Sequence, residues 1–599
     1  MISYIVPILY LIVIPTLYDP STLLRALMLI IIPSLMVLFS QKKELRLNLP
    51  SISIFLLVLI YLISYVKNNQ NYAGFLHGTY GRNFGILSLI GLAFTYILGS
   101  TSQSKDIRIF IISLKILTFL SMLYAVIQLL GLDPIQWEEY TSFILTLGNI
   151  NFSGAFLAIL SNLFLYQIRK SNRNIKYLNL FFYLLIVLLC LLNSSLQSII
   201  ILLINLFVFY LIIYNATLKK ITQSTLTNIK KKSVITTLIL FTASLIVINT
   251  NVNFFTNLSK LGNTDARLRF WITGLKIFED NWLYGVGIEG TQNYIGQYRQ
   301  ISDVRGEGAF AYSDKLHNVF LDHLVSGGVF AGGIYAVFTF LIFKRILILK
   351  KQTLNEEHKQ MYFLLSAIWI GYFFQSLISP DHLVLAALGY LSAGFLFSIP
   401  ISTYPQRNVK KYFKNLVEKI ESIRFSTPLK VFATICIFIS FITYSKAIKQ
   451  DIAMKQYVLS GSLSDSNLEL ILSEWPNPRL LEEVGILEIK KPKDDCFIIR
   501  KISSSLLKID NRNPNGWYLE TICHEQAGNL SSAKKAIDMA ILFDPLNPVY
   551  LISRGVLEYN TGQIEDLSLT IDQIRRVNPD QYYLNELSSL LENSIQNRE

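Results

Sequence analysis

The chain has 599 residues, of which 52% are hydrophobic and 16% are charged, whereas a soluble globular domain carries about 25% charged residues. This composition excludes a soluble protein over the whole length, because long apolar runs fill the first 445 residues. The net charge of +13 lies in short basic clusters between these runs, which argues against binding to nucleic acid and indicates membrane topology.

Thirteen apolar runs resemble membrane-spanning helices, each of which needs about 20 apolar residues. They lie near residues 2–18, 22–39, 50–66, 84–99, 109–131, 149–167, 177–192, 194–214, 233–250, 319–343, 361–379, 382–400 and 429–445. The first run lacks the basic n-region and the cleavage site of a secretory signal, so we interpret it as a spanning helix. The expected fold class is all-α: a polytopic membrane protein with about 12–13 transmembrane helices and a soluble α-helical domain.

Basic residues in the loops set the expected orientation, because positively charged loops remain cytoplasmic. Alternate loops contain 25 Lys and Arg residues, and these loops are 40–49, 100–108, 168–176, 215–232, 344–360 and 401–428. The short loops of the other side contain only two, and these are 19–21, 67–83, 132–148, 193 and 380–381. We therefore predict a cytoplasmic N-terminus and an extracytoplasmic C-terminus.

The domain organisation follows from this topology. A transmembrane domain is expected at 1–400, and its long outer loop is 251–318. A basic cytoplasmic linker at 401–428 and an extra transmembrane helix at 429–445 lead to an extracytoplasmic helical domain at 446–599.

Two short outer segments bear polar groups at the mouths of spans. In HGTYGRNFGILSLI, residues 77–90, Arg82 stands between glycines at the start of the fourth span. In GNINFSG, residues 148–154, Asn149 and Asn151 precede the sixth span. A lone arginine in such a loop can simply extend its charge to the membrane surface. Arg82 is therefore a candidate site residue only together with the other polar residues expected on the same side.

The long outer loop contains the stretch DARLRFWITGLKIFEDNWLYGVGIEG, residues 265–290. Apolar residues recur there at helical spacing, which predicts an amphipathic helix lying in the membrane interface. Arg267 and Arg269 either contact solvent and lipid headgroups or hold an anionic ligand, since guanidinium groups match phosphate oxygens bidentately. The glycines of GVGIEG, residues 285–290, fit a tight turn or close backbone approach, and no strand–helix unit supports a dinucleotide site.

The outer loop ends in AYSDKLHNVFLDHLVSGGVF, residues 311–330, which places two histidines and two aspartates at the lip of the tenth span. A histidine in such a position is often only an interfacial residue. His317 is nevertheless suited to proton transfer near neutral pH, because imidazole is the side chain whose ordinary pKa lies in that range.

The C-terminal domain shows an internal period of 34 residues, marked by repeated prolines and glycines. Trp517 and small alanines at helical spacing accompany the period, and the pattern resembles the tetratricopeptide repeat. A generic helical domain remains the alternative. The expected role is to bind a protein partner or an acceptor, or to brace the long loop.

The four cysteines are too few for a disulfide framework or a zinc site. Cys190 and Cys436 fall inside apolar runs and are expected to be packing residues. Cys496 and Cys523 lie in the C-terminal domain, and spacing alone favours two unpaired thiols, although a pairing stays open.

Taken together, these stretches resemble the O-antigen ligase and polymerase superfamily, which also contains bacterial O-oligosaccharyltransferases. The resemblance covers roughly residues 80–400 and is carried by GRNFG at 81–85, GNINFSG at 148–154, RLRFW at 267–271, YGVGIEG at 284–290 and LHNVFLDHLVSGG at 316–328. It implies a GT-C-like fold in the bacterial inner membrane. It also implies a glycan donor linked to a polyprenyl diphosphate, and a glycan, lipid or protein acceptor, with neither a metal nor a cofactor.

The resemblance also assigns roles to single residues. It implies that Arg82 and Arg267 hold the diphosphate, with Arg269 as a further candidate, and that His317 acts as general base or orients the acceptor. Asn318 is expected to assist His317. Other polar candidates for substrate binding are Asn151 and Gln197; many relatives carry a Ser-Arg pair where this chain reads SSLQS, so Gln197 offers only a neutral hydrogen bond.

Three functions remain open from the sequence. The first is glycan transfer by a ligase or polymerase, and the second is the same chemistry with a protein acceptor. The third is a polysaccharide or lipid transporter, which the lack of mid-membrane carboxylates disfavours. For the first two functions, we expect Arg82, Arg267 and His317 to meet on the extracytoplasmic surface.

Overall fold

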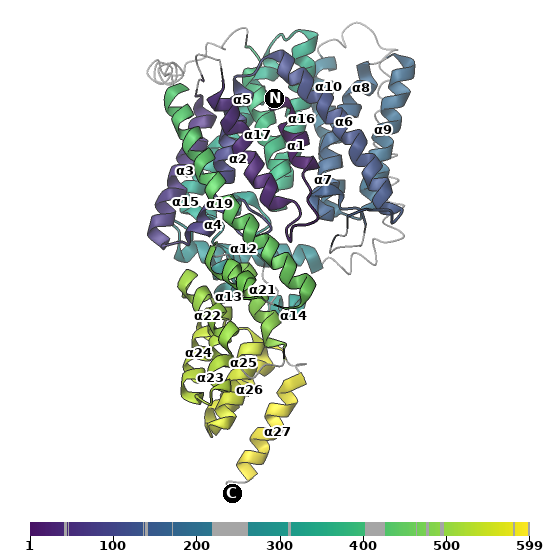
Figure 1. Cartoon of the computed structure of the whole chain (residues 1–599). Helices are drawn as coiled ribbons and strands as arrows, with labels where there is room; N and C mark the ends of the chain where they lie inside the picture. Colours follow the sequence, from purple (N-terminus) through teal and green to yellow (C-terminus); the bar gives the residue numbers. More distant parts are fainter. Residues whose placement is uncertain are drawn as a thin grey trace.

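The computed structural model describes the chain except for residues 41–44, 46, 136, 138–141, 171, 219–261, 309–312, 402–425, 463, 475–477, 492–495, 579–581 and 597–599. The described residues form helices and no strands, so the all-α fold class is confirmed. A bundle of long helices lies at one end of the molecule and a row of shorter helices at the other (Figure 1).

The bundle contains the helices expected to span the membrane. Their bounds are η1 Ile2–Tyr4, α1 Ile5–Leu11, α2 Thr22–Leu38, α3 Leu49–Asn68, α5 Ile86–Ser100, α6 Ser104–Leu129, α7 Ile150–Leu160, α8 Asn162–Lys170, α9 Arg173–Leu192, α10 Leu196–Leu218, α15 Val319–Lys351, α16 Glu356–Ser376, α17 Leu383–Ser398 and α19 Ser426–Ser460. Six described helices have the length and apolarity to cross a membrane, and five shorter apolar helices accompany them. The chain is therefore a multi-pass membrane protein.

Twelve of the thirteen expected spans coincide with described helices. The remaining one, 233–250, lies outside the described residues, as does nearly all of the expected linker 401–428.

Local signals explain where helices begin: Asn48 and Ser51 form a capping box at the start of α3.

The loops at the two ends of the bundle group as the charge pattern predicts. At one end Arg108 forms an ion pair with Glu357 at 2.5 Å, and Lys430 donates to the carbonyl of Ser40 at 3.1 Å. At the other end Tyr18 and Tyr80 reach the C-terminal region. The segments expected outside the membrane therefore share one end of the molecule.

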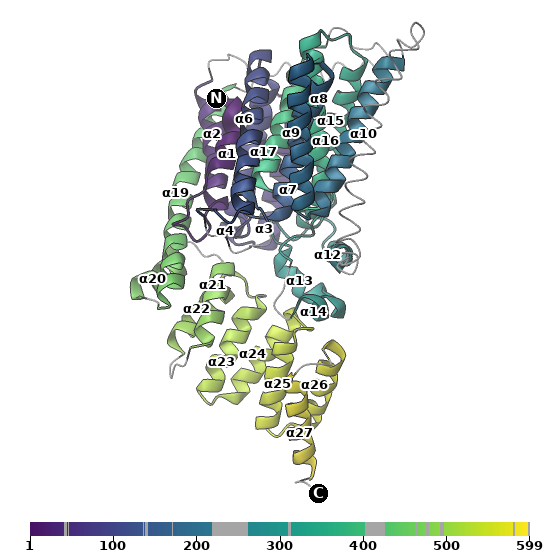
Figure 2. The same cartoon turned by 90° about the vertical axis from the view of Figure 1, so that its right-hand side faces the viewer.

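Short helices of the outer loops lie at that end: η2 Leu145–Leu147, α4 Tyr72–His77, α12 Gly262–Asp280, α13 Gln292–Tyr298 and α14 Ile301–Glu307. Helix α12 crosses the end of the bundle, and α13 and α14 lie between the bundle and the C-terminal helices (Figure 2). The expected amphipathic helix thus ends at Asp280, before the glycine-rich stretch. Its side chains Leu268, Ile272 and Leu275 are exposed and apolar.

The C-terminal domain is a row of antiparallel helices with the bounds α20 Asp465–Glu469, η3 Leu470–Glu474, α21 Pro478–Ile489, α22 Phe497–Ile509, α23 Pro514–Gln526, α24 Leu530–Phe543, α25 Pro548–Asn560, α26 Ile564–Val577 and α27 Tyr582–Gln596. The 34-residue period is visible in equivalent features. Asn513 and Asn547 each cap a helix that begins with proline, and Gly528 and Gly562 both have a φ of 72°.

The structure joins Cys496 and Cys523 in a disulfide. The expectation of two unpaired thiols is therefore wrong. The sequence could not show the pairing because it depends on the antiparallel packing of α22 against α23, which brings the two Cα atoms to 5.5 Å. Cys190 and Cys436 are free and buried, as expected for packing residues.

Candidate active site

His317 lies on the turn that leads into α15. The turn is fixed from both sides, because Asp322 accepts a hydrogen bond from the backbone N–H of Leu316 at 2.9 Å and Asn318 caps the helix by accepting from Leu321 at 3.1 Å. His317 has a φ of 55°, in the left-handed region that a non-glycine residue rarely adopts. Such strain persists only where surrounding contacts enforce it, and it is concentrated at functional sites.

One face of α12 packs against this turn. The ring of Phe270 stacks on His317 with centroids 5.7 Å apart. One turn further along, a Cβ at Gly274 would meet the side chain of Leu316 at 2.4 Å, so only glycine allows this approach. Arg267 lies one turn before Phe270 on the same face, and the helix therefore brings its guanidinium to the side of His317.

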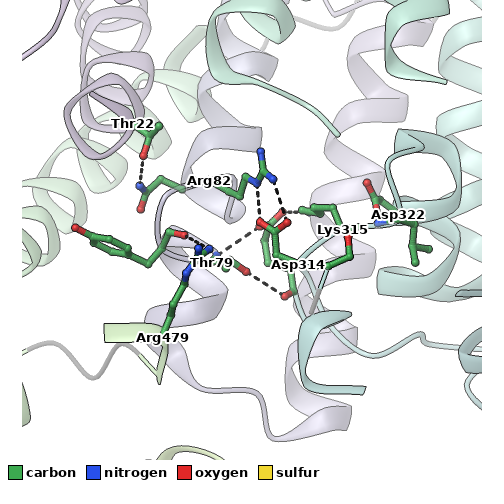
Figure 3. A network of polar contacts seen from close by, with 12 residues as sticks. Thr22, Thr79, Arg82, Asp314, Lys315, Asp322 and Arg479 are labelled. Carbon is green, nitrogen blue, oxygen red and sulfur yellow. Dashed lines mark hydrogen bonds and ion pairs between the residues drawn. The ribbon is translucent and has the colours of Figure 1, made fainter. Parts of the chain in front are cut away.

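Arg82 reaches the site from the turn between α4 and α5. Its Nε donates to Asp314 at 2.6 Å and its Nη2 donates to the other carboxylate oxygen at 3.0 Å, in a bidentate pair (Figure 3). The Arg82 side chain is 25% exposed. No acceptor in the described part of the chain lies within hydrogen-bond distance of its Nη1, so Asp314 orients the fork and leaves donors for a ligand.

A second set of contacts ties the same segments together. Lys315 forms an ion pair with Glu289, and Glu289 accepts from the backbone N–H of Thr79 at 3.4 Å. Three stretches that are distant in sequence, at 77–90, 284–290 and 313–318, are thereby held side by side.

The two arginines of α12 have different surroundings. Arg269 is paired with Asp303 of α14 at 2.5 Å, and both side chains are nearly buried. Arg267 is half-buried and has no ion pair or hydrogen bond within the residues that the structure describes. Burial lowers the pKa of the Arg267 guanidinium from its ordinary value. Arg269 thus has a structural partner, whereas Arg267 is suited to an anionic ligand.

Electrostatics connect the three residues expected to meet. Burial lowers the pKa of His317 to about 4, and the charges of Arg82 and Arg267 contribute to this shift, while Asp314 opposes it. Burial alone would raise the pKa of Asp314, but Arg82 holds it well below its usual range. The imidazole is therefore neutral at pH 7 and able to accept a proton, and the charges of both guanidinium groups act on it.

The glycine-rich stretch lines the back of this arrangement. Gly285 and Gly287 have φ values of 66° and 95°, and a Cβ at Gly285 would meet the backbone of Ser326 at 2.4 Å. The stretch hydrogen-bonds to α15 beside its kink at Gly328. Its glycines serve a tight turn and close backbone approach, as predicted.

Asn151 and Gln197 form a separate group. Asn151 accepts from Ser195 at 2.8 Å, which joins the first turn of α7 to the residue before α10. Gln197 is buried, and its side-chain oxygen and nitrogen have no hydrogen-bond partner among the described residues. No described contact links either residue directly to His317 or Arg82.

The second histidine of the sequence stretch 311–330 has a packing role. His323 is buried in α15, where its Nδ1 lies 2.6 Å from the hydroxyl of Tyr61 and its ring lies against Tyr335. Asp322 supports the His317 turn. Of the four titratable groups at this lip, only His317 and Asp314 lie at the partly exposed site.

A comparison of the chain with known protein families agrees with this fold and geometry. Residues 180–336 match the family model of O-antigen ligases. The match includes α12, the glycine-rich stretch and the His317 turn, and it supports a glycosyltransferase-like role in polysaccharide biosynthesis. No curated protein sequence matches the chain.

Several residues of the site escaped sequence reasoning. Lys315 and Glu289 were not recognised as partners, nor was the pairing of Arg82 with Asp314 across 232 positions. A buried histidine, His382, was also missed. Its Nε2 has no hydrogen-bond partner among the described residues. Its position at the outer end of a span was the available signal.

Proposed function

We propose that the chain transfers a glycan from a polyprenyl diphosphate to an acceptor hydroxyl at the outer face of the bacterial inner membrane, as an O-antigen ligase or polymerase. The observation that supports this proposal most is the packing of α12 on the His317 turn, with the ring of Phe270 stacked on His317, beside the Arg82–Asp314 pair whose charges reach the same imidazole. Within this proposal the N-terminus is cytoplasmic and the transfer reaction needs neither a metal nor a cofactor.

The residues have complementary tasks in this reaction. The acceptor oxygen attacks the anomeric carbon, the bond from that carbon to the diphosphate oxygen breaks, and polyprenyl diphosphate leaves. His317 takes the proton of the acceptor hydroxyl. Arg267 and the unoccupied donors of Arg82 neutralise the charge that develops on the leaving diphosphate.

The other predicted residues have supporting tasks in the proposal. Asn318 fixes the His317 turn, and Arg269 fixes α12 through Asp303, so that Arg269 contributes less to the diphosphate than Arg267. Asn151 and Gln197 are proposed to meet the glycan or acceptor rather than the diphosphate. The exposed apolar side chains of α12 lie in the outer membrane interface, where a lipid-linked donor arrives.

We assign residues 446–599 to a tetratricopeptide-like domain outside the membrane. The 34-residue period of its helices supports this assignment. The disulfide between Cys496 and Cys523 supports the location, because disulfides persist in oxidising compartments. The proposed domain organisation is otherwise that of the charge pattern, with a membrane domain at 1–400 and an extra span at 429–445.

The proposal is tested with the purified protein in detergent, a polyprenyl-diphosphate-linked glycan and a hydroxyl acceptor, by measuring release of polyprenyl diphosphate and extension of the acceptor. Transfer in detergent contradicts a transporter, which needs two compartments. Activity that persists in a chelator supports metal independence, and loss restored by a divalent cation contradicts it.

The nature of the acceptor requires a genetic experiment. Deletion of the chromosomal copy removes long polymer if the protein is a polymerase, and lipid-attached polymer if it is a ligase. Loss of glycosylated protein with both polymers intact would instead identify a protein O-oligosaccharyltransferase.

A further inference from the structure

The turn that carries Arg82 has an unusual backbone. Gly81 and Asn83, on either side of Arg82, have φ values of 78° and 52°. The N–H groups of Arg82 and Asn83 donate to the carbonyl of Thr79 at 3.1 and 2.8 Å. Glycine adopts this conformation freely, whereas the left-handed Asn83 needs support from its surroundings, and both flanks of the turn are held by contacts.

One flank is held by Asp19, in the first outer loop. The side-chain amide of Asn83 donates to Asp19 at 3.1 Å, and the same carboxylate accepts from the backbone N–H of Thr22 at 2.8 Å at the start of α2. Asp19 therefore joins the Arg82 turn to the end of a spanning helix.

The other flank is held by Asp451, on the part of α19 beyond the expected span. The hydroxyl of Tyr80 donates to Asp451, and this carboxylate also accepts from the backbone N–H groups of Tyr18 at 2.7 Å and Asp19 at 2.9 Å. Asp451 is completely buried. A single carboxylate from the C-terminal region thus fixes Tyr80 directly and fixes Asp19, the anchor of the opposite flank.

A further contact reaches the same turn from the C-terminal domain. Arg479, at the start of α21, donates to the carbonyl of Tyr80 at 3.4 Å and lies beside the turn in Figure 3. Its charge also contributes to the low pKa of Asp314, the carboxylate that orients Arg82. The C-terminal region therefore acts on the arginine through its backbone and through its partner.

We propose that Asp451 is a positioning residue for Arg82, so that the C-terminal region is part of the transfer site. The inference rests on the proposed role of Arg82 in holding the donor diphosphate. With the Tyr80 contact in place, the fork of Arg82 faces Asp314 in one orientation and its remaining donors are presented to the diphosphate. Without this contact the turn relaxes and the donor is bound less well.

The chain offers a matched pair of tyrosines for the test. Tyr18 and Tyr80 stack on each other with ring centroids 6.3 Å apart, and both pack against the core of the C-terminal domain. The hydroxyl of Tyr80 donates to Asp451, whereas that of Tyr18 donates to Glu483. Substitution by phenylalanine removes one carboxylate contact in each case and preserves the packing of the ring.

Tyr80→Phe is expected to raise the KM for the lipid-linked donor about tenfold with a much smaller change in kcat, the size expected for a lost hydrogen bond to a charged group. Tyr18→Phe is expected to leave both constants near those of the unsubstituted protein. Equal effects of the two substitutions would overturn the inference, because they would indicate general loosening of the domain contact.

A double-mutant cycle gives the decisive readout. If Tyr80 and Asp451 act through Arg82, Tyr80→Phe has no further effect on the donor KM in an Arg82→Ala background. Additive effects would show that the contact is only structural. Asp451→Asn is expected to resemble Tyr80→Phe, but Tyr80→Phe remains the informative variant if loss of the buried carboxylate prevents folding.

The two proposals fail in different ways. If Arg82→Ala itself leaves the donor KM unchanged, then the proposed role of Arg82 is wrong. If Arg82→Ala raises the KM but Tyr80→Phe does not, then the role of Arg82 stands and the positioning role of Asp451 is wrong.

Discussion

The long outer loop contains two groups of arginines with opposite surroundings. Between α13 and α14, Arg299 forms a bidentate, almost fully buried pair with Asp544, and in α14 Arg305 donates to carbonyls at the end of α26. In α12, Arg267 is half-buried and has no such partner among the described residues. The comparison separates arginines that dock the loop on the C-terminal domain from one that is available to a ligand.

Arg299 and Arg305, here called the docking group, contact equivalent positions in successive repeats of the C-terminal domain. Asp544 follows α24, and the carbonyls that accept from Arg305 lie at the end of α26, the equivalent helix one period later. The buried pair of Arg299 and Asp544 fixes the position of the loop more than it stabilises the fold, because the cost of desolvating both charges offsets their attraction. The docked half of the loop thus supports the half that carries the site.

Substitution of His317 is expected to have the largest effect on transfer. His317→Ala should reduce transfer by roughly 10²–10⁴-fold, because the acceptor hydroxyl loses its general base. Protein abundance in the membrane should be unchanged. His524→Ala, in the C-terminal domain, is the control and should retain full activity; an unchanged product ladder in His317→Ala would end the assignment.

The two arginines of α12 sharpen the contrast. Arg267→Ala should lower transfer by roughly 10²-fold, because a donor to the developing charge is lost. Arg269→Ala should mainly reduce thermal stability, since it leaves Asp303 without its partner. Initial rates with the lipid-linked donor check this order, and equal, mild effects of both substitutions would instead indicate headgroup contacts.

The pH dependence of kcat/KM reports on the same surroundings. Because the pKa of His317 is lowered to about 4, its neutral form persists at all pH values well above 4, and the rate should fall only when the pH approaches that value. Removal of a nearby positive charge in Arg267→Ala should raise this pKa and move the fall to higher pH. An inflection near 6.5 in the unsubstituted protein would contradict a buried base flanked by cations.

The docking group should respond differently. Arg299→Ala leaves Asp544 buried without its charge partner, and such changes destabilise by about 3–5 kcal/mol. Limited proteolysis and thermal unfolding should show a loosened C-terminal domain, while the folded fraction keeps a donor KM close to normal. A large rise in KM in the folded fraction would show that docking and catalysis are not separable.

Much of this organisation was predictable from the sequence, and each success has a physical reason. Apolar runs close to the length that the membrane requires predict spans, and loop charge predicts which loops share an end. Motif order and sidedness led us to expect α12 beside the His317 turn, where Phe270 stacks on His317. The closely packed glycines of 285–290 followed from the absence of a Cβ.

The parts that could not be predicted are contacts between distant segments. Arg82 was expected to be an available cation, but Asp314 occupies two of its donors, and no local pattern indicates such a pair. The partnership of Arg269 with Asp303 and the disulfide depend in the same way on the packing of helices. Asp451 looked like one more polar residue after a span, because its three donors come from two loops near the start of the chain.

The continuity of α19 has a mechanical consequence. This helix of 35 residues runs unbroken from the membrane into the C-terminal domain, and at 1.5 Å per residue it is a rod of roughly 52 Å. The membrane-spanning part of α19 and the C-terminal domain therefore cannot rotate independently of each other. The number of residues between them sets the rotation of one relative to the other about the helix axis. One alanine inserted into α19 before Asp451 would rotate all residues that follow it by about 100° about the helix axis. Asp451 would then lie away from Tyr80, although neither side chain had been changed.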